Sequence, residues 1–293
     1  MPESKSLGSR LADAMNLLAL LLVALAMLFP FVYVFAISFS TMEDVLRGGV
    51  ILWPRHWSPA AYRFTLASPA IIRSLGVSLF LATVGTLVNL AMTASMAYAL
   101  ANRNLLFRRF FLVLVLLPML FAPGMIPRYL VVRATGLINS LWAMIIPSAI
   151  SVWSLLVMRN FLLDLPQELL ESAEIDGATD LQILGRIVLP LSKPVMAAIG
   201  LFYAVGHWNA YFNAILYLTD AAKWPVQVLM RLIVLMGQTN AVGDVSPLDA
   251  TVVPPPFTIQ MATVIVATVP ILIVYPLLQK YFTKGVLTGA IKG

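Results

Sequence analysis

The sequence predicts an all-α, polytopic membrane protein with six transmembrane helices. Of its 293 residues, 60% are hydrophobic and only 11% are charged, and the mean hydropathy is +0.91. Soluble domains are roughly 45–50% apolar and about a quarter charged, so a soluble globule could not bury this much apolar surface. Helix is expected because backbone polar groups in lipid must be paired within their own segment. Six apolar stretches can each cross a hydrocarbon core about 30 Å thick: residues 15–38, 74–101, 107–127, 138–162, 195–218 and 258–282.

The first stretch is expected to be a retained helix that follows a short cytoplasmic segment, residues 1–14. Its apolar core, Leu17 to Phe39, exceeds the roughly 7–15 residues of a signal-peptide core. Prolines occur in several of the stretches and are expected to kink these helices rather than to break them. They are Pro30, Pro118, Pro147, Pro270 and Pro276.

Basic residues predict that both ends of the chain lie in the cytoplasm. With that topology the inner segments hold eleven Lys and Arg residues and the outer segments hold eight, a bias in the direction of the positive-inside rule. The strongest contribution is the cluster of Arg103, Arg108 and Arg109 in one short loop.

Two long outer loops follow from this topology. Residues 39–73 are rich in Trp, Tyr and Pro, which suits the membrane interface. Residues 219–257 are polar but contain an apolar piece, Val226 to Met236, that is too short to span a bilayer. That piece is interpreted as an outer-face helix or a re-entrant element.

An elbow of two short helices is expected on the cytoplasmic face at residues 164–190. Pro166 can begin the first helix, and Gly177 can adopt the left-handed conformation that ends it. Thr179 and Gln182 have the spacing of a capping box for the second. Six of the thirteen acidic residues lie here and should be exposed: Asp164, Glu168, Glu171, Glu174, Asp176 and Asp180. A merely solvated amphipathic loop is the alternative that composition leaves open.

A longer motif covers the same elbow. It matches the pattern EAA-x3-G-x9-I-x-LP everywhere except at Ser172, and its positions are Glu171, Ser172, Ala173, Gly177, Ile187, Leu189 and Pro190. The motif resembles the signature loop of permease subunits in binding-protein-dependent ABC importers. Most of the chain is similar to the six-span permeases of the maltose-type carbohydrate-uptake family. Residues 202–209 and 278–285 are most similar to a subgroup for acidic or complex oligosaccharides, including the second permease of alginate-type importers.

The resemblance implies an ABC importer permease fold in which the elbow docks into a cleft of an ATPase subunit. Glu171 would contact a basic residue there, and Gly177 would provide the turn. The implied coupling residues are Glu171, Ser172, Ala173, Asp176, Gly177, Ile187, Leu189 and Pro190. Loop 219–257 lies where the family has a loop that reaches into the sugar-binding protein. The basic tail 283–293 would reach into the ATPase dimer, whereas composition alone favours a frayed end.

The implied function is to form half of a translocation pathway for oligosaccharides, of the alginate or uronate type, by alternating access. The implied partners are a second homologous permease, two ABC ATPase subunits, a periplasmic or lipid-anchored sugar-binding protein and the bacterial inner (plasma) membrane. The chain lacks a G-x-x-x-x-G-K-[ST] phosphate loop. We therefore expect no catalysis and no bound cofactor in this chain, with ATP and Mg²⁺ held by the ATPase subunits.

Polar residues in the fifth stretch are candidates for the substrate path, because polar groups inside apolar spans are costly unless they face partners or water. The candidates are His207, Trp208, Asn209, Tyr211 and Asn213. On a continuous helix Asn209 and Asn213 would share one face. The alternative, that such residues hold helices together through hydrogen bonds, is the favoured interpretation for these residues. Asn89, Thr93 and Ser95 of the second stretch are weaker candidates for the path, and packing is favoured there.

Other classes of function have less support. An ion-coupled secondary transporter usually buries acidic residues at the bilayer midplane, and the predicted spans contain none. An intramembrane enzyme is disfavoured because His207 has no catalytic partner nearby in sequence. There is no cysteine and there are only two histidines, so no metal site is expected. The net charge of +6 is explained by basic residues that flank spans rather than by nucleic-acid binding.

Overall fold

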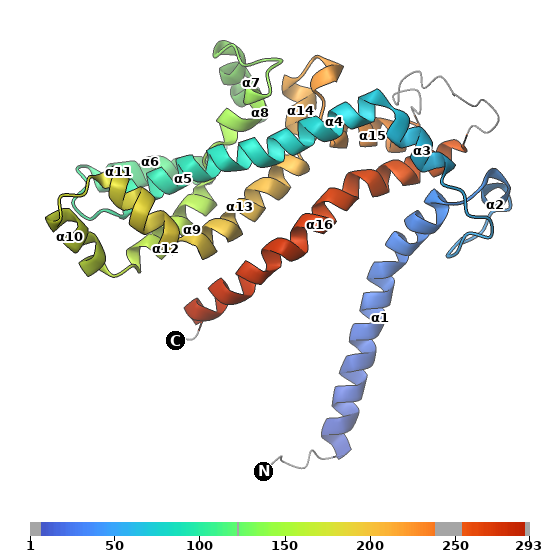
Figure 1. Cartoon of the computed structure of the whole chain (residues 1–293), viewed down its shortest axis with the longest axis horizontal. Helices are drawn as coiled ribbons and strands as arrows, with labels where there is room; N and C mark the ends of the chain where they lie inside the picture. Colours follow the sequence, from blue (N-terminus) through green and yellow to red (C-terminus); the bar gives the residue numbers. More distant parts are fainter. Residues whose placement is uncertain (1–6, 122, 238–253, 291–293) are drawn as a thin grey trace. The chain divides into compact units, whose positions relative to one another are not determined.

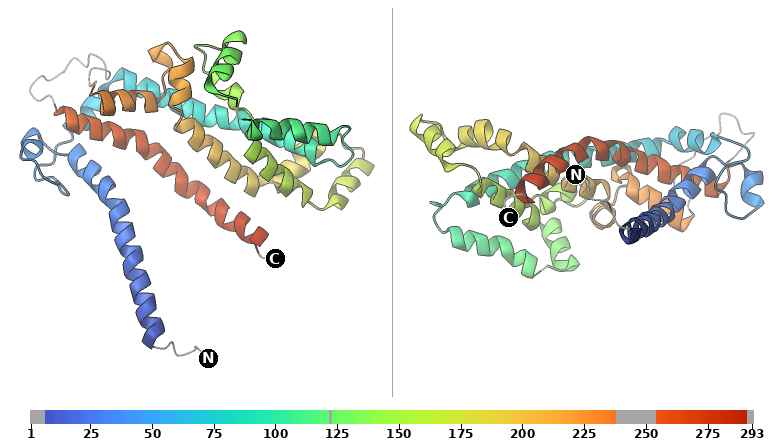
Figure 2. Two further views of the ribbon diagram at one scale, coloured as in Figure 1. Left: turned by 180° about the vertical axis from the view of Figure 1, so that it is seen from behind. Right: turned by 90° about the horizontal axis from the view of Figure 1, so that it is seen from below.

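A computed structural model describes residues 7–121, 123–237 and 254–290. Every regular element in these ranges is a helix, which confirms the all-α class. Figures 1 and 2 show these helices along the chain. The chain divides into two compact units. The first covers Met1–Ile71 and Met230–Ala267, and the second covers Ile72–Leu229 and Thr268–Gly293.

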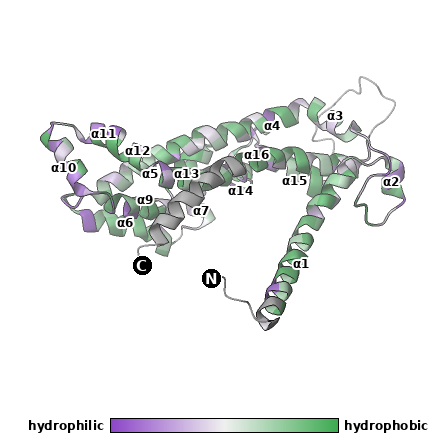
Figure 3. Cartoon of the chain, turned by 60° about the horizontal axis from the view of Figure 1, so that its bottom comes forward, coloured by the Kyte–Doolittle hydropathy of each residue, from purple (hydrophilic) through white to green (hydrophobic). Residues whose placement is uncertain are grey.

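The first unit begins with α1 (Leu7–Ser38), a 32-residue helix. Within Leu11–Ser38, the most apolar 18-residue segment has a mean hydropathy of 2.7, and none of that segment is buried within the described structure. Colouring by hydropathy shows this helix as almost uniformly apolar (Figure 3). An apolar surface of this size needs lipid or a partner to cover it, as expected for the first span.

The predicted outer loop 39–73 is packed rather than extended. It contains α2 (Met42–Leu46) and α3 (Ala60–Ala67). The Trp57 ring contacts Phe39, with ring centroids 5.3 Å apart, and the Tyr62 hydroxyl is hydrogen-bonded to the Ser38 hydroxyl at 2.7 Å. The aromatic residues noticed in the sequence thus fold back onto the end of α1.

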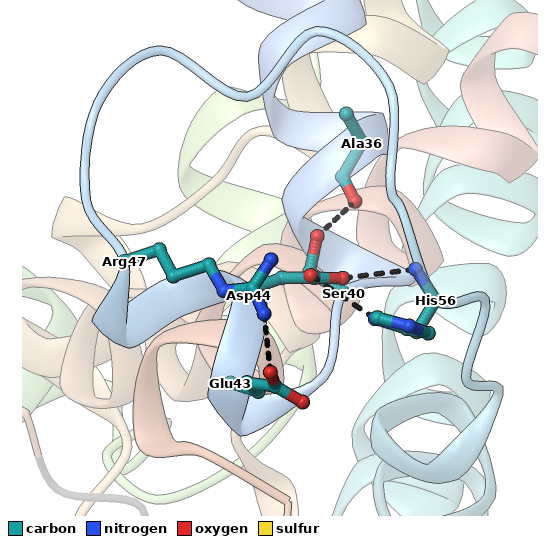
Figure 4. A network of polar contacts seen from close by, with 6 residues as sticks. All are labelled: Ala36, Ser40, Glu43, Asp44, Arg47 and His56. Carbon is teal, nitrogen blue, oxygen red and sulfur yellow. Dashed lines mark hydrogen bonds and ion pairs between the residues drawn. The ribbon is translucent and has the colours of Figure 1, made fainter.

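An acidic residue organises the same loop (Figure 4). Asp44 is buried, and its carboxylate accepts a hydrogen bond from the backbone N–H of His56 at 3.0 Å, with the His56 ring Nδ1 at 3.3 Å. Arg47 and Glu43 pair beside it on the surface of α2, and the Ser40 hydroxyl donates to the Ala36 carbonyl at 2.9 Å. The hydrogen bond from the His56 backbone holds the pKa of Asp44 below its ordinary value.

The second unit is built around three packed helices: α5 (Thr86–Ala101), α9 (Val152–Leu163) and α13 (Lys193–Trp208). One apolar stretch of 33 residues ends with α5 and also includes α4 (Pro69–Phe80) and the π-helical η1 (Leu81–Gly85). The second unit therefore has its own core, whose fully buried members include Ala97, Leu155, Met158 and Ile199.

The third and fourth predicted spans are interrupted. α6 (Arg108–Leu120) has 13 residues and is followed by α7 (Met125–Ala134), so the stretch 107–127 is not one continuous helix. Thirteen residues rise only about 20 Å, which is short for a span. The fourth consists of α8 (Trp142–Ile145), the 3₁₀-helical η2 (Ile146–Ser148) and α9, and it bends by 53°. Pro147 lies at the bend and lacks the N–H that would continue the helical ladder.

The elbow between the fourth and fifth predicted spans is present as two short helices. α10 (Gln167–Ile175) is the first; α11 (Asp180–Ile183), the π-helical η3 (Leu184–Val188) and α12 (Leu189–Leu191) make up the second. An 84° bend then leads into α13. In Figure 1, α10 and α11 lie at one end of the α5–α9–α13 core, and α7 and α14 (Phe212–Tyr217) project beyond its side.

The fifth predicted span, 195–218, is wrong as a single helix. α13 ends at Trp208, and α14 begins only at Phe212. Asn209 has φ −87° and ψ 5°, and Tyr211 has φ −103°, which takes the backbone off the helical path. Asn209 and Asn213 therefore do not share the face of one continuous helix.

The predicted outer loop 219–257 contains η4 (Ala221–Lys223) and the 11-residue α15 (Val226–Met236). The apolar piece is therefore helical, and its Val226 side chain is fully buried. The middle of the loop, 238–253, lies outside the described residues. The last helix, α16 (Pro256–Ala290), continues through the sixth predicted span into the predicted tail, of which 291–293 lie outside the described residues.

Three helices of the described part are long and apolar enough to cross a membrane, and up to five spans result if each bent pair counts as one. The six-span count therefore stays a prediction. The count of described spans falls below six because α6 is too short to be counted, and it reaches five only if each of the two bent helix pairs is counted as one span.

Candidate functional site

A cavity of about 820 Å³ lies in the second unit, among the ends of several helices. Its volume falls in the roughly 300–1,000 Å³ range of small-molecule sites. Four prolines line it: Pro118, Pro123, Pro127 and Pro147. Pro123 lies between α6 and α7, and Pro147 lies in η2 at the bend of the fourth predicted span. Since proline interrupts helices, these two residues line the cavity where the predicted spans are broken.

One wall of the cavity is a polar network that joins α5 to α13. The Asn89 side-chain nitrogen donates to the Ser148 carbonyl at 3.2 Å and also lies 3.2 Å from Nε2 of His207. The Asn89 amide and the His207 imidazole thus link α5 to α13. The Tyr203 hydroxyl accepts from the Ser151 backbone N–H at 2.9 Å. All five residues line the cavity.

The predicted substrate-path residues are divided by the helix break after α13. His207 and Asn213 line the cavity. Trp208 is buried away from it, Asn209 is exposed, and neither Asn209 nor Tyr211 is among the lining residues. The break explains this, because it rotates α14 relative to α13 and brings Asn213, but not Asn209, to the cavity.

Some of these polar residues join helices, and some of them also line the cavity. Thr93 is fully buried and hydrogen-bonded to the Tyr203 hydroxyl at 2.7 Å, so it holds α5 and α13 together, as expected. Asn89 and His207 also join the two helices, but they line the cavity as well. Ser95 is exposed and donates to the Ala91 carbonyl of its own helix at 2.8 Å.

Two glycines allow the close approach of these helices. A Cβ on Gly85 would lie 2.6 Å from Nε2 of His207, and one on Gly200 would lie 3.2 Å from a Leu90 methyl group. Small residues at helix interfaces permit backbones to pack closely in membranes. Gly85 therefore makes the space that the His207 ring occupies.

The elbow has the local geometry that its sequence predicts. Gly177 has φ +80°, the left-handed conformation that glycine adopts without strain. Thr179 and Gln182 form the expected capping box, with the Thr179 N–H donating to the Gln182 side chain at 2.9 Å. All six acidic residues of the segment are exposed, so the hydrophilic character seen at α10 and α11 in Figure 3 faces outward.

The coupling residues that the resemblance implies fall into two groups. Ala173 is buried in the core with Ile183 and Val188, and Ile187 and Leu189 pack against that core. The others are exposed, namely Glu171, Ser172, Asp176, Gly177 and Pro190. The elbow thus has a base fixed to the helical core and a surface free to contact another protein.

The exposed surface combines acidic and apolar groups. Glu171 and Glu174 line a hollow of about 300 Å³, together with Tyr98 and Arg103. Ile175 is 86% exposed, although a large aliphatic side chain is among those most often buried. The elbow therefore presents both acidic and apolar side chains outward.

Helices connect the hollow at the elbow with the cavity. α5 contributes Asn89 to the cavity and Tyr98 to the hollow, and α9 contributes Val152 to the cavity and Leu162 to the hollow. Positions 89 and 98 are about 14 Å apart along a helix axis. A displacement of the elbow can therefore reach the cavity through rigid, packed helices.

The basic cluster used to predict orientation has a second role. Nε of Arg108 and Nε of Arg159 both donate to the Leu100 carbonyl, at 3.1 and 3.0 Å. Leu100 lies in the last turn of α5, where carbonyl groups lack helical partners and favour positive charge. These two arginines thus cap the end of α5 that lies near the elbow.

Sequence reasoning missed several cavity residues. Tyr203 lies within the segment 202–209 that carried the family resemblance but was not singled out, and Arg128 was used only to predict orientation. Arg128 follows the third apolar stretch by one residue, next to Pro127, and this pairing of a charge with a helix-breaking residue was an available signal. Gly85 offered no signal, because its role depends on a residue 122 positions later.

Comparison with known proteins decides the family. Residues 91–288 match the family described as the binding-protein-dependent transport system inner membrane component. The chain belongs to this family. The match confirms the resemblance inferred from the elbow motif, and it confirms that the chain is an inner membrane permease component of an ABC importer.

Individual permeases of this kind are similar over almost the whole chain. The polygalacturonan/rhamnogalacturonan transport system permease protein YtcP of Bacillus subtilis (strain 168) is 47% identical over 97% of this chain and 99% of its own length. Protein LplC of the same organism is 44% identical over 98% of this chain and 96% of its own length. One chain in the crystal structure of a bacterial ABC transporter involved in the import of the acidic polysaccharide alginate is 31% identical, with a TM-score of 0.89, covering 95% of this chain and 99% of that chain.

Proposed function

We propose that this permease forms half of a translocation pathway for acidic oligosaccharides. The observation that supports this most directly is the cavity: its lining is mainly apolar, it includes the polar side chains of Ser148, Ser151 and Asn213 and the ring of Phe202, and it has no acidic residue among the described ones. Amide, hydroxyl and imidazole groups can bond sugar hydroxyls, and aromatic residues are common in such pockets. Two similar proteins are named for polygalacturonan or alginate transport, which supports acidic sugars as the substrate class.

The energy for transport comes from separate ATPase subunits in this proposal. The elbow offers them exposed acidic groups around Glu171 together with the exposed apolar side chains of Ile175 and Leu181. Charge pairing at such a contact fixes its register more than it adds affinity. ATP and Mg²⁺ then belong to those subunits and not to this chain.

The same proposal includes a second permease, two ATPase subunits and a sugar-binding protein. The second permease supplies the other half of the pathway, and loop 219–257 and tail 283–293 are the segments proposed to contact the binding protein and the ATPase dimer. Both ends of the chain are proposed to be cytoplasmic, on the basis of the Lys and Arg distribution.

Reconstitution tests the proposed function. The chain is co-expressed with its neighbouring transport genes, the complex that copurifies is placed in proteoliposomes, and uptake of galacturonate, mannuronate and maltose oligosaccharides is measured with the binding protein present. We expect ATP-dependent uptake of the uronates. Uptake driven by an ion gradient without ATP would instead support the secondary transporter, and uptake of maltodextrin alone would contradict the acidic substrate class.

A further inference from the structure

Arg128 is the charged residue of the cavity. Among the 22 lining residues within the described part of the chain, it is the single Lys, Arg, Asp or Glu. Its side chain is exposed, and no hydrogen bond or ion pair to a described residue occupies its guanidinium group. A cavity with one cation and no compensating acid presents a positive potential to whatever enters it.

The position of Arg128 on its helix directs it to the cavity. Arg128, Val131, Val132 and Thr135 all line the cavity and are spaced at helical intervals along α7 and its end, so they form one stripe. Arg133 lies on the same helix and is equally exposed, but it does not line the cavity. The helix therefore carries two arginines, of which one faces the cavity.

The chemistry of the opposite wall complements this cation. Ser148, Ser151 and Asn213 line the cavity and are not buried, so they offer polar groups for hydroxyls, and Phe202 adds an exposed aromatic ring. A guanidinium group has a planar set of donors that fits a carboxylate with two parallel hydrogen bonds. A sugar acid has hydroxyls for these polar groups and a carboxylate for the arginine.

We propose that Arg128 recognises the carboxylate of a uronate unit in this cavity and thereby makes the permease itself selective for acidic over neutral oligosaccharides. The inference rests on the proposed function and deepens it, because it assigns the selectivity to one side chain of this chain. It places part of the specificity in the translocation pathway in addition to whatever the binding protein selects.

The test compares an acid with its neutral ester in the complete importer. Initial rates of ATP-dependent uptake into proteoliposomes are measured for trigalacturonate and trimannuronate and for their fully methyl-esterified forms. Esterification removes the charge but keeps the sugar rings and hydroxyls. The acid-to-ester ratio of the wild type is divided by that of each variant, so that discrimination by the shared binding protein cancels.

The variants are Arg128→Gln, Arg128→Lys and the matched control Arg133→Gln. We expect Arg128→Gln to lower the acid-to-ester ratio about tenfold, as is typical for the loss of one hydrogen-bonded charge. Arg128→Lys should fall in between, because lysine keeps the charge but not the planar fork. Arg133→Gln should leave the ratio unchanged. ATPase activity without sugar verifies that each variant complex is assembled.

Two different failures can be told apart. If the wild type prefers the acids and Arg128→Gln keeps the same preference, the role of Arg128 is overturned while the proposed function stands. An equal fall for Arg128→Gln and Arg133→Gln also overturns it, because the effect would then be one of general surface charge. A wild type that takes up only the esters or neither form contradicts the proposed substrate class, and this inference with it.

Discussion

Gly85 and His207 meet where η1 approaches α13. A Cβ at position 85 would lie 2.6 Å from Nε2 and 2.9 Å from two ring carbons of His207. These distances are too short for non-bonded atoms, so the Cβ would clash with the ring. The His207 ring lines the cavity, so a Cβ at position 85 would push the ring into that space. The hydrogen bond between Asn89 and His207, at 3.2 Å, therefore depends on the absence of a side chain at Gly85.

We predict that Gly85→Ala lowers both stability and transport. Overpacking of a filled site typically costs about 1–3 kcal/mol, and the displaced imidazole would disturb the cavity wall. Thermal unfolding of the purified complex and uptake in proteoliposomes measure the two effects. Gly76→Ala is the control, because a Cβ there meets no atom within 4 Å. Equal behaviour of the two variants would contradict the close contact.

Asp44 gives the outer loop a dependence on pH. The pKa of its carboxyl is lowered in the folded protein, chiefly by the His56 backbone hydrogen bond. A lowered pKa means that the stabilisation is complete above the ordinary carboxyl value of about 3.9 and is lost as the pH falls through the lower, folded value. The Asp44 carboxyl should therefore contribute no pH dependence between about pH 5 and 7.

We predict that Asp44→Asn loosens the loop at neutral pH and removes its acid transition. The amide keeps the shape of the carboxylate but loses the charge that strengthens the hydrogen bond from His56. Acrylamide quenching of tryptophan fluorescence reports the change when Trp57 is the remaining tryptophan. In the parent protein quenching should rise only below about pH 4. A rise near pH 6 in both proteins would implicate a histidine instead.

At the scale of the element, the elbow depends on a small residue at its base. Ala173 is 8% exposed and packs in the core with Ile183 and Val188. Its neighbour Ser172 is exposed on the same helix and donates to the Leu169 carbonyl at 3.1 Å. The two adjacent positions of the motif therefore have opposite environments.

We predict that Ala173→Leu destabilises the elbow whereas Ser172→Leu is tolerated. The added bulk at position 173 must displace core side chains, at a cost of about 1–3 kcal/mol, while at position 172 it extends into open space. Limited proteolysis between α10 and α11 measures loosening of the elbow. Faster cleavage of Ser172→Leu than of Ala173→Leu would show that the base of the elbow is elsewhere.

Elements with local signals were predictable from the sequence, and those decided by distant contacts were not. The elbow was predicted down to its turn and cap, because Gly177, Thr179 and Gln182 act within a few residues of one another. The break after Trp208 was missed, since no glycine or proline lies between α13 and α14 and hydropathy continues across it. Likewise, the cavity could not be foreseen, because it is assembled from α5 to α14.

At the scale of the whole molecule, one compact unit holds both the cavity and the elbow. α5 and α9 connect them, and the arginine caps at Leu100 fix the α5 end near the elbow. Packed cores tend to move between discrete arrangements rather than to deform continuously. A partner that moves the elbow should therefore move the cavity wall with it, which is the physical requirement for coupling ATP hydrolysis to transport.

We predict that Glu171→Lys separates ATP hydrolysis from uptake in the assembled importer. Glu171 lies on α10 and lines the hollow, so a reversed charge there should break the proposed charge pairing with an ATPase subunit. Uptake should fall at least about tenfold, as expected when one partner of an interfacial charge pair is lost, while the chain still inserts into the membrane. Glu168→Lys is the control, because Glu168 is exposed on the same helix but does not line the hollow. Normal uptake by purified Glu171→Lys complexes, or an equal loss in Glu168→Lys complexes, would show that coupling does not pass through this contact.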